Sequence, residues 1–244
     1  MEIVLFTALG VGMSTIFGGV LGFIFQKTSQ KFNDIILAFS SGIMLCASIL
    51  GLILPSLEYG GNFPVLVTVL GIICGAVLIN LCDKLVPQIN TLIGNESQQN
   101  NKVLLFVLAI AIHNLPEGIA TGVAFGADDV SQALTVAIGI ALQNLPEGMV
   151  IISPLLGCGF SKKKTFLIAV FTGFTEIFGT FLGYFAISVT RVILPFALAL
   201  AGGTMIYVIC DEMIPESHVN GKCRSVSYAI LIGFCVMLAF DYFI

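Results

Sequence analysis

Long uninterrupted apolar runs are the feature that most constrains the fold of this chain. Eight such runs follow one another, with approximate bounds 2–26, 34–57, 63–82, 103–126, 131–157, 164–188, 192–213 and 225–244. A helix needs roughly 20 apolar residues to cross the hydrocarbon core of a bilayer. Barrel strands would instead show short alternating segments. The sequence therefore predicts an all-α integral membrane protein with eight transmembrane helices in a single transporter-sized domain, residues 1–244.

Composition supports the assignment to a membrane. Hydrophobic residues make up 57% of the chain and charged residues 10%, whereas soluble domains carry about 25% charge. In lipid, every backbone polar group has to be satisfied internally, which a helix achieves. The first run carries Glu2 and no basic segment, so it is interpreted as the first span and not as a cleavable signal peptide. The expected location is the plasma (inner) membrane, with multiple passes.

The distribution of basic residues predicts the orientation of the chain. Of the ten Lys and Arg residues, only Arg191 falls in a loop that follows an even-numbered span. The other nine fall in odd-numbered loops, and Lys and Arg are retained on the cytoplasmic side. The odd-numbered loops are therefore expected inside, which places both termini outside (N-out/C-out). The nine residues are Lys27, Lys31, Lys84, Lys102, Lys162, Lys163, Lys164, Lys222 and Arg224.

A repeated motif lies on the fourth and fifth predicted spans. Residues 110–118 read IAIHNLPEG, and residues 140–148 read IALQNLPEG. Consecutive spans run antiparallel, and paired Pro-interrupted helices in corresponding positions indicate a transporter's binding site. Pro116 and Pro146 each remove one helical hydrogen bond and are expected to kink these central helices beside the polar residues.

Three carboxylates are predicted near the middle of the bilayer: Glu117, Glu147 and Glu176. A charged side chain at that depth costs roughly 2.5–3.5 kcal/mol on insertion scales, so a function is expected for it. With a rise of 1.5 Å per residue, His113, Gln143 and Glu176 lie about 16–18 Å from the ends of their spans. In a hydrocarbon core of roughly 30 Å, these levels converge near the midplane.

Residue spacing groups the polar side chains into a candidate metal site. His113 and Glu117 are four residues apart and share a helix face, as do Gln143 and Glu147. Imidazole, amide and carboxylate together suit Zn²⁺ or a similar first-row dication better than Ca²⁺ or Mg²⁺. A structural His–Glu ion pair is the alternative. One imidazole among three carboxylates leaves negative charge that a bound metal would balance.

The two motifs resemble those of the ZIP metal-ion transporter family and are most similar to its bacterial GufA-like branch. The resemblance extends over nearly the whole chain. It implies eight helices with the fourth and fifth central, and metal import into the cytoplasm through a midplane two-metal site. By position it implies one site of His113, Glu117, Gln143 and Glu147. The second site would consist of Asn114, Glu117, Asn144, Glu147 and Glu176, with Glu117 and Glu147 bridging both ions.

Two departures from the family pattern affect what can be expected. Some relatives carry an acidic residue where Asn144 stands, so the second site here has less negative charge. Many relatives have a His-rich segment between the third and fourth spans, whereas this chain has no His there. Cytosolic metal sensing by that loop is therefore not expected.

Further polar residues are weaker candidates. An exit site is predicted at the cytosolic end of the seventh span, with a solvated helix end as the alternative; its residues are Asp211, Glu212, Glu216 and His218. Residues on the second span are candidates for lining the entrance, with packing as the alternative; they are Met44, Cys46 and Ser48.

The expected function is transport and not catalysis. The transported substrate would be Zn²⁺ or a similar divalent cation such as Fe²⁺, Mn²⁺ or Cd²⁺. Two alternatives remain open: an intramembrane metalloenzyme, although the chain has no HExxH motif, and a proton or sodium carrier that uses the same acidic residues. The expected partners are divalent metal ions and the lipid bilayer, with a homodimer left open. No basic cluster suits nucleic acid.

Overall fold

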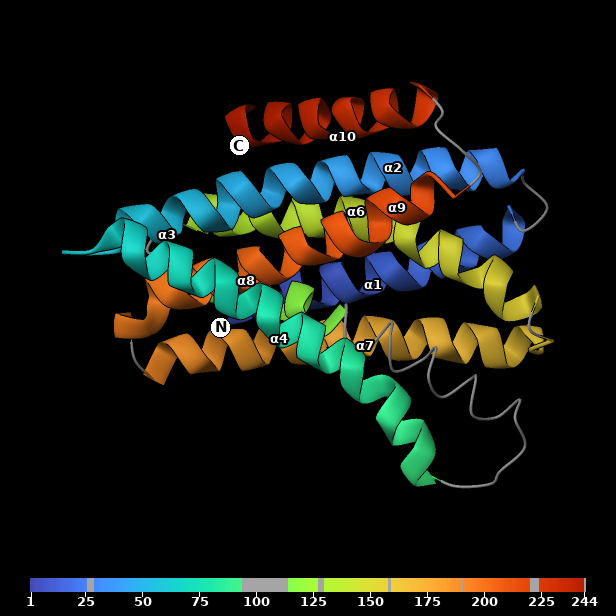
Figure 1. The fold of residues 1–244 in the computed structure, drawn as a ribbon, viewed down its shortest axis with the longest axis horizontal. Helices are drawn as coiled ribbons and strands as arrows, with labels where there is room; N and C mark the ends of the chain where they lie inside the picture. The colour runs from blue at the N-terminus through green and yellow to red at the C-terminus, as the bar shows by residue number, and fades with distance from the viewer. Residues whose placement is uncertain are drawn as a thin grey trace.

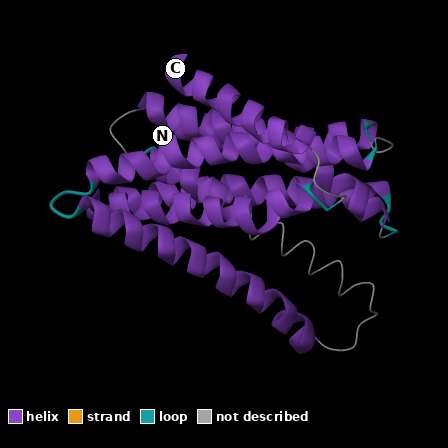
Figure 2. Cartoon of the chain, turned by 45° about the horizontal axis from the view of Figure 1, so that its top comes forward, coloured by secondary structure: helices purple, strands orange, loops and turns teal. Residues whose placement is uncertain are grey.

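The computed structural model describes residues 1–25, 29–93, 114–126, 130–157, 159–189, 191–219 and 224–243, and the regular structure in these ranges is helical (Figures 1 and 2). Seven helices in this part of the chain are long and apolar enough to cross a membrane. The all-helical membrane prediction is confirmed. The fourth predicted span, 103–126, is described only from residue 114, and its residues 114–124 are helical.

The named elements follow one another along the chain. They are α1 (Glu2–Ile24), α2 (Gln30–Ala47), η1 (Ser48–Ile53), α3 (Leu54–Tyr59), α4 (Pro64–Ile93), α6 (Val130–Gly157), α7 (Lys162–Val189), η2 (Arg191–Ile193), α8 (Leu194–Val208), η3 (Ile209–Met213), α9 (Ile214–Ser217) and α10 (Arg224–Phe243). Helix α4 continues to Ile93, past the predicted end of the third span at residue 82, while the apolar span within it ends at Cys82. Apolar sequence marks the membrane-spanning part, and the helix itself continues beyond it.

Two of the spans contain a wide π-helical turn directly before a proline. In the first, η1 joins α2 to α3 ahead of Pro55, and Gln30–Tyr59 forms one span. In the second, η3 joins α8 to α9 ahead of Pro215, and the span runs to Ser217 instead of ending near residue 213 as predicted. Proline cannot donate a backbone hydrogen bond, and a π turn accommodates that loss without ending the helix.

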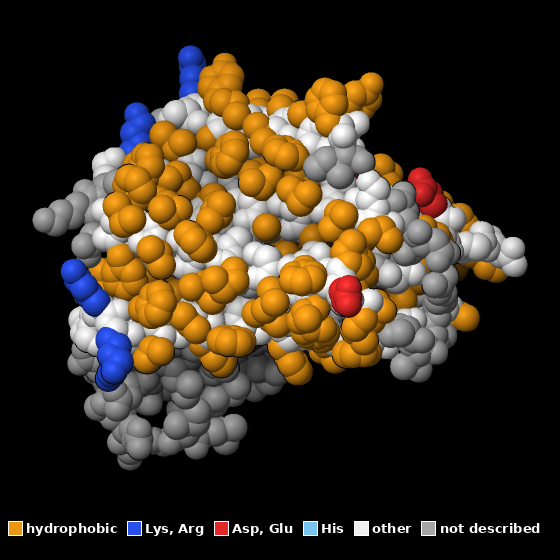
Figure 3. Space-filling view, turned by 180° about the vertical axis from the view of Figure 1, so that it is seen from behind, with side chains coloured by type: hydrophobic (Ala, Val, Ile, Leu, Met, Phe, Trp, Pro, Cys, Tyr) orange, Lys and Arg blue, Asp and Glu red, His pale blue; other side chains and the backbone are white. Residues whose placement is uncertain are grey.

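The helices pack side by side into a bundle. Helix α1 packs against both α6 and α7, α4 packs along α8, and α10 packs along the outside of α2 (Figure 1). Both chain termini lie at the same end of the bundle (Figure 1). The visible outer surface is largely hydrophobic, with Lys and Arg at one end and Asp and Glu toward the other (Figure 3). This pattern is typical of a protein surrounded by lipid.

Candidate metal centre

The glycines that end the two motifs determine how closely neighbouring helices approach. A Cβ atom on Gly118 would lie 2.2 Å from the carbonyl oxygen of Glu176, and one on Gly148 would lie 2.3 Å from that of Thr15. No side chain fits at such distances, so the backbones make direct contact at both glycines. The first motif therefore packs against α7 at Glu176, and the second packs against α1 at Thr15.

Helices α1 and α7 also touch one another at a pair of glycines. A Cβ atom on Gly12 or on Gly173 would lie 2.4 Å from the carbonyl oxygen of the other residue. Each glycine precedes, by three residues, the position that packs against a motif: Thr15 on α1 and Glu176 on α7. Thr15 and Glu176 thus occupy equivalent positions on the two helices that flank the motifs.

The carboxylate of Glu176 is completely buried and is surrounded by hydrogen-bond donors. Its Oε1 accepts from the hydroxyl of Thr15 at 2.6 Å and from the side-chain amide of Asn114. Its Oε2 accepts from Nδ2 of Asn144 at 2.6 Å. The two asparagines occupy the same position in the two motif copies. Glu176 therefore connects both motif copies to α1.

Glu117 forms a second polar pair beside this cluster. Gln143 donates from Nε2 to Oε1 of Glu117 at 2.7 Å, and both side chains are buried. Ser40 of α2 donates to the carbonyl oxygen of Gln143 at 3.1 Å and lies 3.5 Å from Oε1 of Glu147. Three residues predicted for the first site, Glu117, Gln143 and Glu147, thus lie near one another with α2 in contact, while the fourth, His113, lies outside the described residues.

Three buried oxygen atoms of the motifs have no hydrogen-bond partner among the described residues: Oε2 of Glu117, Oε1 of Gln143 and Oδ1 of Asn144. An unpaired buried acceptor costs about 1–3 kcal/mol, and such atoms are rare in folded proteins. All three present lone pairs, and a cation would satisfy them. The donor set around them is therefore suited to a positively charged ligand.

The charge balance of the cluster also favours a bound cation. Glu117 interacts electrostatically with both Glu147 and Glu176. The Lys and Arg side chains whose burial the structure describes are all exposed. No three His, Cys, Asp or Glu side chains in the described ranges lie close enough to hold one ion by themselves. An ion at this position would therefore need amide oxygens as well, or the imidazole of His113, which lies outside the described residues.

The predicted exit residues lie along the end of the seventh span. Asp211 and Glu212 fall in the π turn η3, and Glu216 and His218 follow around α9. Nδ1 of His218 is 3.0 Å from the carbonyl oxygen of Ile214 in its own helix. In the part of the chain that the structure describes, these residues do not form a group of three potential metal ligands.

The structure adds Asp34 of α2 to this region. It is 6% exposed, and its charge acts on Glu216 together with that of Glu212. Gln30 donates to Asp34 at 3.3 Å. Sequence reasoning missed Asp34 because the residue lies at the predicted beginning of a span, where a charge needs no explanation.

The residues considered for the entrance are packed inside the bundle. Met44 and Cys46 belong to two hydrophobic clusters and are at most 1% exposed. The hydroxyl of Ser48 donates to the carbonyl oxygen of Met44 at 2.7 Å. These positions match the packing alternative better than a role in lining an entrance.

A helical bundle with an apolar outer surface and a buried carboxylate–amide cluster defines a multi-pass membrane protein with an intramembrane polar site. The family model described as ZIP Zinc transporter matches residues 90–241. The chain therefore belongs to the ZIP zinc transporter family, whose members are transporters and not enzymes. The predicted resemblance is confirmed, and the metalloenzyme alternative is set aside.

Individual relatives are similar over most of the chain. The zinc transporter GufA of Myxococcus xanthus is 36% identical over 199 residues, which cover 78% of each chain. The zinc transporter ZIPB of Bordetella bronchiseptica is 33% identical over 93% of this chain and 77% of its own length. The zinc transporter ZupT of Streptococcus mutans is 32% identical over 95% of this chain and 93% of its own length.

Proposed function

We propose that this chain, as a single transmembrane domain of residues 1–244, carries Zn²⁺ into the cytoplasm through a site in the middle of the bilayer. The observation that carries the proposal is the set of three buried acceptor oxygens without partners on Glu117, Gln143 and Asn144. Related proteins named as zinc transporters make Zn²⁺ the first candidate substrate. Fe²⁺, Mn²⁺ and Cd²⁺ are the related dications to test beside it.

Two ions bind next to one another in the proposed site. The first lies among Glu117, Gln143, Glu147 and His113, and the second among the same two glutamates with Asn114, Asn144 and Glu176. Support comes from the two neighbouring hydrogen-bonded groups, one centred on Glu117 and one on Glu176. The oxygens seen there suit hard dications, and nitrogen from His113 would shift the preference toward Zn²⁺.

Import toward the cytoplasm rests on the charge distribution. Lys and Arg gather at one end of the bundle (Figure 3), and the chain termini lie at the other end (Figure 1). By the positive-inside rule the basic end faces the cytoplasm. The span that ends there carries the proposed exit site at its end, formed by Asp211, Glu212, Glu216 and His218. The bacterial relatives are consistent with the plasma membrane, and a homodimer stays a prediction.

The test is metal uptake by the purified protein in sealed liposomes. We expect Zn²⁺ to accumulate inside, with competition from other dications and no effect of Na⁺ at equal ionic strength. Glu117→Gln is expected to abolish uptake. The matched control is Glu58→Gln, which removes one carboxylate from the exposed end of the same bundle. Uptake of Na⁺ or H⁺ by this protein without a dication would favour the carrier alternative instead.

A further inference from the structure

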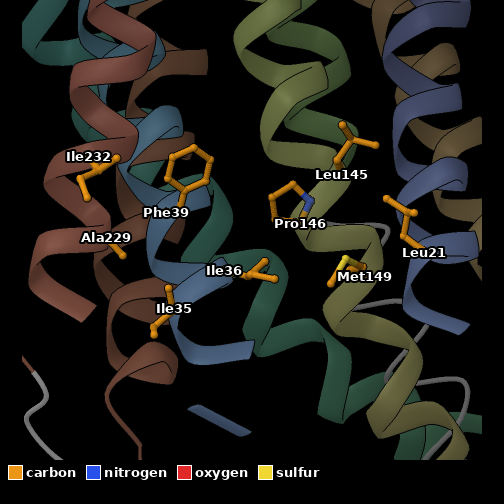
Figure 4. A pocket seen from close by; sticks show the side chains of 9 residues that line it. All are labelled: Leu21, Ile35, Ile36, Phe39, Leu145, Pro146, Met149, Ala229 and Ile232. Atoms are coloured by element: carbon orange, nitrogen blue, oxygen red, sulfur yellow. The ribbon is translucent and has the colours of Figure 1, made fainter. Parts of the chain in front are cut away.

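An apolar groove lies among α1, α2, α6 and α10, separate from the polar centre. It has a volume of about 310 Å³. Its lining consists of Leu21, Ile35, Ile36, Phe39, Leu145, Pro146, Met149, Ala229 and Ile232 (Figure 4). None of these nine side chains carries a hydrogen-bonding group other than the weak thioether of Met149. Most of them are half-buried, and Ile232 at the rim is 56% exposed, so the groove is open to its surroundings.

The surroundings determine what can occupy this groove. The lining residues belong to membrane-spanning helices, so the opening faces the hydrocarbon of the bilayer. Water is not stable in a space without polar partners. An empty space would forfeit the dispersion contacts of its walls. A lipid acyl chain is the occupant that the bilayer supplies at this depth.

Two basic residues lie where the groove approaches the basic end of the bundle. Lys31 precedes Ile35 by one turn of α2, and Arg224 begins α10 within about a turn and a half of Ala229. Both basic side chains are exposed. They are positioned to meet a negatively charged headgroup at the end of a chain lying in the groove.

An aromatic pair lies on the α1 side at the same end. The rings of Phe25 and Phe32 have centroids 6.4 Å apart. Phe25 follows Leu21 by one turn on α1, and Phe32 precedes Ile36 by one turn on α2. The pair therefore bridges the ends of two helices that line the groove, and the boundary of the hydrocarbon is expected at this level.

We propose that the groove binds one anionic phospholipid. One acyl chain lies against α6 at Leu145, Pro146 and Met149, and the phosphate is held by Lys31 and Arg224. The acyl chain would then contact the part of α6 around Pro146, which also carries Gln143 and Glu147. The proposal concerns a ligand other than the transported ion and does not depend on which ion that is.

Tryptophan fluorescence can test the proposal because the chain contains no Trp. Ile232→Trp places one fluorophore at the rim of the groove. The matched control is Leu231→Trp, at a position that is 58% exposed on the same helix but does not line the groove. Both variants are reconstituted in phosphatidylcholine vesicles containing a small fraction of brominated phosphatidylglycerol or brominated phosphatidylcholine.

We expect brominated phosphatidylglycerol to bind beside the fluorophore of the Ile232→Trp variant about tenfold better than brominated phosphatidylcholine, because each nearby basic residue attracts an anionic lipid. The Leu231→Trp control is expected to show no preference.

In the Ile232→Trp background, Lys31→Gln with Arg224→Gln should remove the preference for the anionic lipid. Lys162→Gln with Lys163→Gln, at the start of α7, should leave this preference unchanged. Equal quenching of the Ile232→Trp variant by both lipids would overturn the proposal. Protection of its fluorophore from both lipids would do so too, since another protein chain would then cover the groove.

Native mass spectrometry of the unaltered chain provides a second measurement. After delipidation and exposure to an equal mixture of the two lipids, we expect one phosphatidylglycerol to remain bound per chain. The Lys31→Gln, Arg224→Gln variant is expected to lose it. Retention of phosphatidylcholine in equal amount would contradict selection of an anionic headgroup.

Discussion

Thr15 of α1 donates its hydroxyl to Oε1 of Glu176 of α7 at 2.6 Å, and both side chains are almost fully buried. The two residues occupy equivalent positions, each three residues after a glycine at the contact between α1 and α7. The two flanking helices therefore differ: α7 contributes a carboxylate to the centre, and α1 contributes a hydroxyl that stabilises this carboxylate. This asymmetry limits the negative charge of the second proposed metal site.

Thr15→Val removes one donor from the buried carboxylate while keeping the shape of the side chain. We expect the metal-free protein to lose about 1–3 kcal/mol of stability, since a buried acceptor loses a partner. If Glu176 binds a metal, the ion replaces the missing donor, so Zn²⁺ should raise the unfolding temperature of the variant more than that of the unaltered protein. Thermal unfolding in detergent with and without Zn²⁺ measures both effects.

Thr204→Val is the matched control for this experiment. Thr204 is also buried, and its hydroxyl donates at 2.6 Å to the carbonyl oxygen of Ala201 in its own helix. Its replacement is expected to change stability less and to leave the increment from Zn²⁺ unaltered. An equal increment in all three proteins would contradict metal binding by Glu176.

The membrane orientation can be tested at two exposed positions at opposite ends of the bundle. In a background without the seven native cysteines, Glu58→Cys should react with an impermeant thiol reagent added to intact cells. Lys163→Cys should react only after the membrane is opened, because the basic end is predicted to face the cytoplasm. The opposite labelling pattern would overturn the orientation and the proposed direction of transport.

His113→Ala tests the role of the imidazole that the sequence places four residues before Glu117. We expect the fold to be retained and metal affinity to fall strongly, with a greater loss for Zn²⁺ than for Mn²⁺. The reason is that the remaining predicted ligands are oxygens, which suit harder cations. Isothermal calorimetry with both metals measures the change. Unchanged affinity for Zn²⁺ would exclude His113 as a ligand.

Some residues of the centre could be predicted from the sequence, and others could not. The pairs Gln143–Glu147 and Asn114–Asn144 could be placed because a repeated motif and helix periodicity fix their faces. Thr15 and Ser40 could not, because a single hydroxyl in an apolar run resembles any other. Their contacts with Glu176 and with Gln143 arise only when α1 and α2 pack against α6 and α7.

In the fold, too, features set by a single segment could be predicted from the sequence, whereas features set by packing between segments could not. Apolar length predicted the spans, because the requirement to cross the bilayer acts on each segment separately. It did not predict the π turns before Pro55 and Pro215, since hydrophobicity carries no information on hydrogen-bond register. Asp34 was missed for a related reason: its proximity to Glu216 depends on the packing of α2 near α9.

Acidification is expected to weaken metal binding. Carboxylates bind metal in the deprotonated form, so protons and metal compete for Glu117, Glu147 and Glu176, and affinity falls as pH falls. Glu147→Gln removes one of the competing groups, so the residual affinity of this variant should depend less steeply on pH. Metal titrations at several pH values measure the two slopes. Equal slopes would show that Glu147 does not exchange a proton for the metal.

Replacing a bridging residue should differ from replacing a residue of one site. Glu147 belongs to both proposed sites, whereas Asn144 belongs only to the second, where it contributes an unpaired oxygen and a hydrogen bond to Glu176. We expect Glu147→Gln to lower the number of bound ions and nearly abolish uptake. Asn144→Ala should retain one bound ion and part of the uptake. Bound metal per protein and initial uptake rates in matched liposomes measure both variants. If the two variants lose metal and transport to the same degree, a single mononuclear site describes the centre better than a bridged pair.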